Sequence, residues 1–217
     1  MLTLDDGSPM KTLNWYFDFI SPYAYLQSTR LDDFAQHAVV RCHPVLFAGL
    51  LAHHGHKGPA EIAPKRTFTY EHVAWLAKRN GIALTFPVAH PFNPLPLLRL
   101  AILFDSPMDV VSRLFRYVWA EGHLPTDPQP WAALLAELEV TPEELDQPEV
   151  KDALRASTQA AIEAGVFGVP TCEIGGQLIW GFEATDMVMA RFEDDPFFES
   201  PAWQAARQVG AGVQRKA

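Results

Sequence analysis

Apolar and aromatic residues cluster in short segments near both ends of the chain. The segments "LNWYFDF" (13–19) and "AVVRCHPVL" (38–46) are short and rich in apolar, aromatic or β-branched residues, which is typical of buried strands. Between them, apolar positions recur at roughly helical spacing from Pro22 onward, and a helix tolerates proline best in its first turn. The pattern therefore predicts a strand, a helix and a second strand.

Between residues 47 and 165 the pattern is almost entirely helical. Apolar side chains return at steps of three and four residues, and glycine or proline separates the segments. The predicted helical segments are "FAGLLAHH", "RTFTYEHVAWLAKRN", "PLPLLRLAILF", "MDVVSRLFRYVWAEG", "PWAALLAEL" and "EVKDALRASTQAAIEAG".

The strand pattern returns after Gly168. The segments "TCEIGG" and "QLIWGF" predict two short strands joined at Gly175-Gly176, a pair that is typical of a tight hairpin turn. The segment "EATDMVMARFED" then predicts a closing helix.

A β-α-β unit followed at a distance by a β-β-α unit is the order of elements in a thioredoxin-like domain. We therefore predict an α/β fold in which a thioredoxin-like domain (13–47 plus 166–205) carries a large all-helical insertion domain (48–165). Residues 1–12 and 206–217 are expected to be loose termini.

Composition and charge narrow the classes of function. Hydrophobic residues make up 48% of the chain and charged residues 20%, as in ordinary soluble globular proteins. Subtracting 26 acidic from 17 basic residues gives a net charge of −9, which argues against nucleic acid or an anionic membrane as the main partner. No apolar stretch approaches the roughly 20 residues of a membrane span, and residues 1–12 lack the apolar core of a secretory signal. We expect a cytoplasmic protein.

The two cysteines, Cys42 and Cys172, lie 130 positions apart. This is neither a disulfide framework nor a zinc-binding pattern. Their neighbours are apolar or β-branched, so we expect two buried, reduced thiols.

Two features near the predicted strand ends indicate a binding site. Ser21 follows an apolar strand and precedes the helix that begins at Pro22, where a hydroxyl group either caps the helix or donates a hydrogen bond to an anion. Val169-Pro170 stands directly before the hairpin, where a cis peptide bond is plausible. Such a bond would leave the Val169 backbone free to pair with an extended, peptide-like ligand.

These segments resemble a known family. "WYFDFISPYAYL", "AAIEAGVFGVPTCEIGGQLIWG", "GPAEIAPKR" and "HPFNPLPLLRLA" are similar to the 2-hydroxychromene-2-carboxylate isomerases and kappa-class glutathione transferases, which are relatives of the DsbA-like oxidoreductases. The likeness covers nearly the whole chain. Oxidoreductase relatives carry Cys-x-x-Cys at the helix start, whereas this chain has Ser21-Pro22-Tyr23-Ala24 and therefore lacks a dithiol at that position.

The resemblance implies that the thiol comes from glutathione. It implies that Ser21 stabilises the glutathione thiolate, which is the reactive form because only a thiolate is nucleophilic. In such isomerases the thiolate adds to an activated alkene, the former double bond rotates, and elimination regenerates glutathione. The cofactor supplies the covalent chemistry, and the protein supplies orientation and electrostatics.

The sequence departs from the family pattern after Trp180-Gly181. Relatives carry a small polar residue followed by Asp-Arg, whereas this chain has Phe182, Glu183 and Ala184. Glu183 keeps a carboxylate for the γ-glutamyl ammonium group, and Phe182 offers only its backbone N–H to the γ-glutamyl carboxylate. Glu183 also suits a helix N-terminus without any ligand, and both interpretations are open.

Histidines supply the other candidate residues. "HHGHKG" (53–58) is either a mobile polar loop or a ligand-contacting loop, and it lacks the companions of a familiar metal site. By resemblance we place His56 and Lys65 near glutathione, and His54 and His90 near the substrate. His90 either acts as an acid or base near neutral pH or caps the turn that follows it.

Three functions compete. The favoured one is a glutathione-dependent isomerase of 2-hydroxychromene-2-carboxylate-type substrates in aromatic degradation. The second is a kappa-like glutathione transferase or peroxidase, and the third is a thioredoxin-like binding protein without turnover. The resemblance also implies a homodimer.

Overall fold

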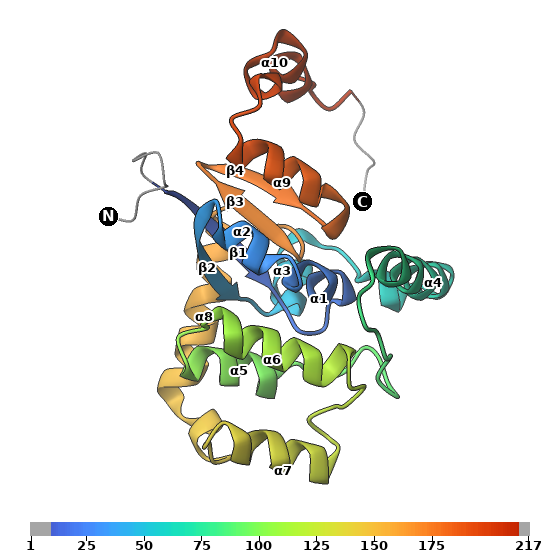
Figure 1. Ribbon diagram of the computed structural model, residues 1–217, viewed down its shortest axis with the longest axis vertical. Coiled ribbons are helices and arrows are strands. Elements are labelled where there is room, and N and C mark those ends of the chain that lie inside the picture. The colour runs from blue at the N-terminus through green and yellow to red at the C-terminus, as the bar shows by residue number, and fades with distance from the viewer. Residues whose placement is uncertain (1–9, 213–217) are drawn as a thin grey trace.

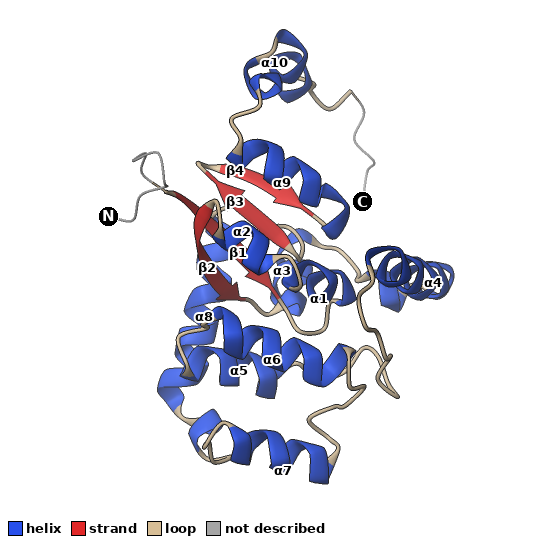
Figure 2. Cartoon of the chain, viewed as in Figure 1, coloured by secondary structure: helices blue, strands red, loops and turns tan. Residues whose placement is uncertain are grey.

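A four-stranded mixed sheet forms the centre of the computed structural model, which describes residues 10–212 (Figures 1 and 2). The strands are β1 (Lys11–Phe17), β2 (Ala38–Pro44), β3 (Thr171–Ile174) and β4 (Gln177–Trp180). Their order in the sheet is β2-β1-β3-β4. Strand β1 is parallel to β2 and antiparallel to β3, and β3 and β4 form the predicted hairpin. Gly175 and Gly176 make the hairpin turn with φ angles of 57° and 82°, which glycine adopts without steric cost.

Helices α1 (Pro22–Ser28) and α2 (Leu31–Ala35) connect β1 to β2, and α9 (Thr185–Phe192) follows β4. This is the predicted thioredoxin-like order of elements. The remaining helices are α3 (Phe47–His54), α4 (Ala63–Asn80), α5 (Leu95–Leu103), α6 (Met108–Trp119), α7 (Pro128–Glu137), α8 (Pro148–Glu163) and α10 (Pro201–Arg207). Short 3-10 turns are η1 (Pro59–Glu61), η2 (Glu144–Asp146), η3 (Phe182–Ala184) and η4 (Pro196–Glu199). The predicted α/β fold with many inserted helices is thereby confirmed.

The two faces of the sheet pack against different helices. Successive side chains of a strand point to opposite faces. Trp15 and Phe17 accordingly lie in a large apolar cluster with residues of α1, α2, α5, α6 and α9. Tyr16 lies in a smaller cluster that includes Leu50 of α3 and Ala161 of α8. The sheet is therefore covered on both sides.

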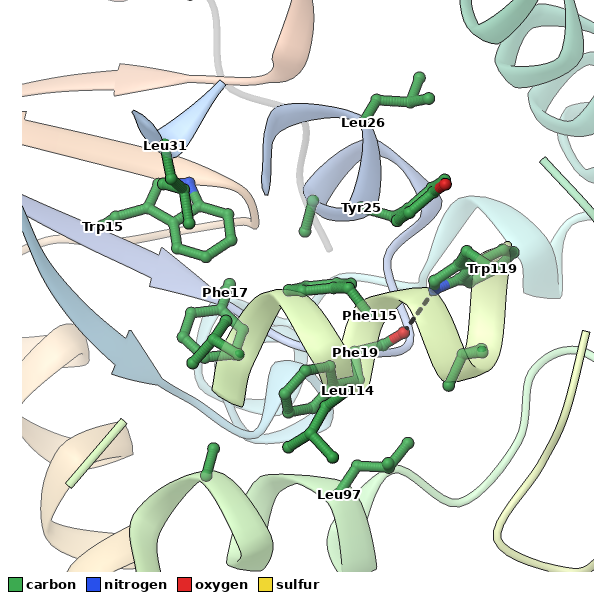
Figure 3. Packing of buried hydrophobic residues seen from close by; sticks show 14 of the residues in the cluster. Trp15, Phe17, Phe19, Tyr25, Leu26, Leu31, Leu97, Leu114, Phe115 and Trp119 are labelled. Carbon is green, nitrogen blue, oxygen red and sulfur yellow. Dashed lines mark hydrogen bonds between the residues drawn. The ribbon is translucent and has the colours of Figure 1, made fainter. Parts of the chain in front are cut away.

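Phe115 of α6 connects the helical segment to the sheet (Figure 3). Its ring centroid lies 5.9 Å from that of Trp15, 5.6 Å from that of Phe17 and 4.6 Å from that of Phe19. All four side chains are fully buried. The aromatic core therefore crosses the predicted boundary between the thioredoxin-like part and the insertion.

Some predicted boundaries need correction. Strand β1 begins at Lys11, so residues 11 and 12 belong to the sheet and not to a loose terminus. Helix α10 ends at Arg207, so residues 206 and 207 are helical. The other predictions for the termini fall largely on 1–9 and 213–217, which lie outside the described residues. The division into two separate domains stays a prediction.

The lengths and compositions of the described helices show whether any of them could cross a membrane. None of the helices within residues 10–212 combines the length and the apolar character that crossing a bilayer requires.

Candidate functional site

The loop between β1 and α1 presents Ser21, and a buried carboxylate holds this loop. Asp18 accepts hydrogen bonds from the backbone N–H groups of Ile20, at 3.0 Å, and Phe47, at 2.9 Å. The Ser21 N–H donates to the Asp18 carbonyl at 3.0 Å. Asp18 is fully buried, and this burial raises the pKa of its carboxyl group to about 7, against the lowering effect of the two N–H donors. Asp18 thus ties the β1–α1 loop to the start of α3.

Two side chains from the helical segment hold the next two carbonyl groups of the same loop. The indole Nε1–H of Trp119 donates to the Phe19 carbonyl at 2.8 Å (Figure 3). The His90 Nε2 atom lies 2.8 Å from the Ile20 carbonyl oxygen. Because consecutive peptide groups are bound from α6 and from the α4–α5 connection, the backbone before Ser21 has a fixed orientation.

The Ser21 hydroxyl group has two partners. Its oxygen accepts from the Ala24 N–H at 3.2 Å, which makes Ser21 the N-cap of α1, and its proton is directed at the Val169 carbonyl oxygen at 3.3 Å. The Val169–Pro170 peptide bond is cis, as predicted. The structure thus brings Ser21, Val169 and Pro170 together from opposite ends of the chain. The sequence suggested that the Val169 carbonyl group is free. In the structure it is not wholly free, because the Ser21 hydroxyl group already contacts it.

Several backbone N–H groups of the same segments lack a partner among the described residues. Within the part of the chain that the structure describes, the N–H groups of Tyr23, Val169 and Phe182 have no hydrogen-bond acceptor. Val169 and Phe182 are both buried, at 7% and 6% exposure. Unpaired buried N–H groups are rare in folded proteins. These donors are therefore available to a peptide-like ligand with carboxylate and carbonyl oxygens.

Glu183 lies beside α4 and α1. Its Oε1 atom is 3.6 Å from Nδ1 of His72, which in turn is 2.9 Å from the Tyr23 hydroxyl oxygen. Burial, and to a lesser degree the charge of Glu183, raises the pKa of Tyr23 to about 12. About half of the Glu183 side chain is exposed, so its carboxylate remains accessible to an ammonium group.

His90 lies at the cis peptide bond His90–Pro91. Its Nδ1 atom is 2.8 Å from the Tyr70 hydroxyl oxygen, and its Nε2 atom faces Ile20. Burial lowers the pKa of His90 below its ordinary value, and the nearby charge of Arg66 acts in the same direction, against the hydrogen bond to Ile20. The expected alternative, a cap of the following turn, is wrong, since both ring nitrogens bind other segments.

The remaining candidates are spread over α3 and α4. The His54 Nε2 atom lies 3.2 Å from the Val166 carbonyl oxygen, close in sequence to the cis proline. His56 and Lys65 are exposed, and neither side chain forms a hydrogen bond or ion pair within residues 10–212, although the His56 backbone N–H donates to the Leu51 carbonyl. Within residues 10–212, no group of three potential ligands forms a cation site.

Both cysteines are free. Cys172 is fully buried, with its Sγ atom 3.6 Å from Oε1 of Gln27, and this burial raises the pKa of its thiol. Cys42 is partly buried, and burial raises the pKa of its thiol to about 12. Neither thiol is therefore a nucleophile near neutral pH.

Sequence reasoning missed several of these residues. Asp18 is an acidic residue at the end of an apolar segment, and this pattern is a signal for a buried, hydrogen-bonded carboxylate. Tyr70, His72 and Trp119 give no signal of their own, because helical periodicity places them on a helix but not against a particular loop.

The chain is similar in sequence to known proteins. Residues 12–193 match the model of the DsbA-like thioredoxin domain. A 2-hydroxychromene-2-carboxylate isomerase of Pseudomonas putida is 30% identical over 185 residues, which cover 78% of this chain and 88% of that protein. A glutathione S-transferase kappa 2 of Caenorhabditis elegans is 28% identical over 214 residues, which cover 86% of this chain and 93% of that protein.

A solved structure shows the same fold. The structure of a 2-hydroxychromene-2-carboxylate isomerase superposes with a TM-score of 0.75 at 24% identity, covering 92% of this chain and 100% of that one. The chain therefore belongs to the DsbA-like thioredoxin proteins and, among them, to the family of the 2-hydroxychromene-2-carboxylate isomerases and kappa-class glutathione transferases.

Proposed function

We propose that this chain is a glutathione-dependent isomerase of 2-hydroxychromene-2-carboxylate-type substrates in aromatic degradation. The observation that carries the proposal is the contact between the Ser21 hydroxyl group and the Val169 carbonyl group beside unpaired backbone N–H groups. The family supports the choice of reaction, because the Pseudomonas putida relative carries this enzyme name. We further propose that the protein acts in the cytoplasm as a homodimer.

The residues present fit glutathione. Val169 offers a free N–H to the cysteinyl part of an extended tripeptide, in the manner of strand pairing. Phe182 offers its N–H to the γ-glutamyl carboxylate, and the exposed Glu183 carboxylate suits the γ-glutamyl ammonium group. His56 and Lys65 are exposed cationic or polar groups for the remaining carboxylate.

When bound, glutathione supplies a thiolate nucleophile. The Ser21 hydroxyl group would donate a hydrogen bond to that sulfur in place of the Val169 carbonyl oxygen, and the neighbouring N–H of Tyr23 at the start of α1 would favour the same negative charge. Asp18, Trp119 and His90 keep the loop in place while this exchange of partners occurs. We assign His54 and His90 to the part of the site that contacts the substrate.

Dithiol chemistry does not suit this site. The residues at the start of α1 are Ser21, Pro22, Tyr23 and Ala24, so no cysteine is available to form a mixed disulfide. Cys172 is buried, and burial keeps its thiol protonated by raising its pKa.

A kappa-like transferase is the second candidate, supported by the similarity to the Caenorhabditis elegans protein. The test is an assay of the purified protein with 2-hydroxychromene-2-carboxylate, with and without glutathione, beside an assay with a chloro-nitro aromatic. We expect isomerisation that requires glutathione and little conjugation. Conjugation without isomerisation would favour the transferase, and absence of glutathione binding would favour a binding protein without turnover.

A further inference from the structure

Tyr70 and His90 form a hydrogen-bonded pair that connects the surface of α4 to the Ser21 loop. The Tyr70 hydroxyl oxygen lies 2.8 Å from His90 Nδ1, and His90 Nε2 lies 2.8 Å from the Ile20 carbonyl oxygen. That carbonyl belongs to the peptide bond between Ile20 and Ser21. Tyr70 is therefore two hydrogen bonds, and His90 one, away from the peptide group that precedes the proposed thiolate-stabilising residue.

The hydrogen-bond partners of His90 determine which of its ring nitrogens carries a proton. A carbonyl oxygen only accepts hydrogen bonds, so Nε2 of His90 carries a proton. Burial lowers the pKa of His90, so its ring is neutral near pH 7 and Nδ1 is an acceptor. The Tyr70 hydroxyl group consequently donates to Nδ1 at 2.8 Å, the shorter of its two contacts, and the His90 carbonyl oxygen at 3.3 Å is a second acceptor for the same proton. The Tyr70 oxygen keeps lone pairs that are free to accept a hydrogen bond from another molecule.

The surroundings of the pair suit an aromatic ligand. The ring of Phe86 lies 5.5 Å from that of Tyr70, and the rings of Phe92 and Trp119 lie 6.0 Å and 5.5 Å from that of His90. Phe86 is 40% exposed, and Tyr70 is partly exposed, so this aromatic surface is accessible. Arg66 of α4 is the charged side chain that acts on the titration of both Tyr70 and His90.

We propose, on the basis of the function proposed above, that Tyr70 is a catalytic residue that accepts the proton of a substrate hydroxyl group and passes its own proton to His90. The substrate class is a hydroxylated aromatic or cyclic hemiketal acid. Its ring lies against Phe86 and its hydroxyl group contacts the Tyr70 oxygen.

The proton transfer balances without any further reactant. The substrate O–H bond breaks, and its proton binds the Tyr70 oxygen while the Tyr70 proton binds Nδ1 of His90. The product is an imidazolium whose Nε2–H still donates to the Ile20 carbonyl and whose Nδ1–H donates to Tyr70. Reversal of both transfers returns the proton to the substrate. His90 acts only through Tyr70 and is therefore a positioning and proton-storing residue.

The test compares Tyr70→Phe and His90→Gln with the wild-type enzyme in glutathione-dependent turnover of 2-hydroxychromene-2-carboxylate. General acid–base catalysis contributes roughly 100- to 10,000-fold, and we expect a loss of kcat in this range for Tyr70→Phe with little change in the KM for glutathione. The His90→Gln variant retains an N–H that reaches toward the Ile20 carbonyl but has no basic nitrogen. On acidification the wild-type rate should fall first as the glutathione thiolate is protonated and then more steeply, at lower pH, as His90 is protonated, because burial lowers the His90 pKa. Both variants should keep the first fall and lose the second.

Two further measurements separate the relay from its alternatives. Tyr117→Phe removes another tyrosine hydroxyl group that donates to a backbone carbonyl, that of Leu124, and it controls for the cost to stability. NMR of the histidine side-chain nitrogens should show a proton on Nε2 of His90 and a response of Nδ1 to Tyr70→Phe. If the Tyr70→Phe variant turned over the substrate as fast as the wild-type enzyme, the relay alone would be overturned. Absence of turnover in the wild-type enzyme would overturn the relay together with the proposed function.

Discussion

The Ser21 hydroxyl group has one donor and two acceptor sites, and the fold already uses part of this capacity. Its oxygen caps α1 by accepting from Ala24, and its proton contacts the Val169 carbonyl at 3.3 Å, which is a long distance for a hydroxyl donor. The cap does not compete with a ligand, because it uses a lone pair. The weakly held proton is therefore the part of Ser21 that is available to a thiolate.

The substitution Ser21→Ala should lower turnover by removing the hydrogen bond to the thiolate, and it should lower stability by removing the helix cap. Loss of a hydrogen bond to a charged acceptor, about 1.5–3 kcal/mol, corresponds to a roughly ten- to hundredfold loss of turnover near pH 7. Loss of the cap should lower the free energy of unfolding by about 1 kcal/mol. The lost activity should partly return at higher pH, where glutathione ionises without help.

Ser200→Ala is the matched control for the cap. Ser200 caps α10 by accepting from the Trp203 N–H at 3.1 Å, and α10 lies apart from α1 in Figure 1. This variant should lose similar stability and keep wild-type turnover. If both variants lost turnover equally, the effect of Ser21→Ala would be one of helix capping and not of catalysis.

Asp18 should make stability depend on pH. Its pKa is about 7 in the folded protein, because of burial, and about 3.9 in an unfolded chain. Between these values the folded state binds more protons, so the contribution of Asp18 to the free energy of unfolding falls as pH rises, by at most ~1.4 kcal/mol per pH unit. Denaturant unfolding of wild type and Asp18→Asn from about pH 4 to pH 8 measures this. A difference between the two proteins that is constant over this range would contradict it.

Single residues also show how far sequence reasoning extends. Ser21, Val169 and Pro170 were predictable because each stands at the end of a strand or helix, where turn and cap chemistry is local. His90 was placed near the substrate, but its partners Ile20 and Tyr70 were not predictable. Those contacts depend on how the α4–α5 connection lies across the β1–α1 loop, and no local pattern encodes that arrangement.

At the scale of elements, α6 helps to position the site. Trp119 at its end binds the Phe19 carbonyl, and Phe115 one turn earlier fills the space among the aromatic residues of β1 (Figure 3). The sequence predicted α6 as a helix from its apolar spacing. That its aromatic face packs on the sheet followed only from the structure, since periodicity gives the face of a helix but not its partner.

Phe115→Ala should be strongly destabilising. The side chain is fully buried and contacts aromatic residues from β1, the β1–α1 loop and α1, so its removal leaves a cavity that rigid neighbours fill poorly. We expect a loss of about 3–5 kcal/mol in the free energy of unfolding. Phe115→Leu should lose less. A single cooperative unfolding transition that shifts as a whole would fit a shared core, whereas two separate transitions would favour two independent domains.

At the scale of the whole molecule, the β1–α1 end and the cis-proline segment form one site although 148 positions separate Ser21 from Val169. The antiparallel pairing of β1 with β3 brings them together. The thioredoxin-like order of elements was predictable because strands and hairpin lie near the chain ends. The way the helices pack around the sheet was not predictable, because the helical pattern is the same for many arrangements.

The proposed homodimer has a simple test. One chain has a mass of 24.2 kDa, so sedimentation at micromolar concentration should give twice that mass. The aromatic side chains Phe68 and Trp75 of α4 are 62% and 52% exposed, and large exposed apolar groups are often buried by association. A mass near 24.2 kDa at that concentration would contradict the dimer.

The most direct measurement of the central claim is the pKa of the glutathione thiol when it is bound to the protein. Ultraviolet absorbance of the thiolate, recorded as a difference between protein with and without glutathione, gives this value for wild type and Ser21→Ala. The thiols of Cys42 and Cys172 do not interfere, because burial raises the pKa of both. We predict a bound pKa about one to two units below the value of about 8.5 for a free thiol in the wild type, and a return toward that value in Ser21→Ala. The same pKa in both proteins would contradict the account.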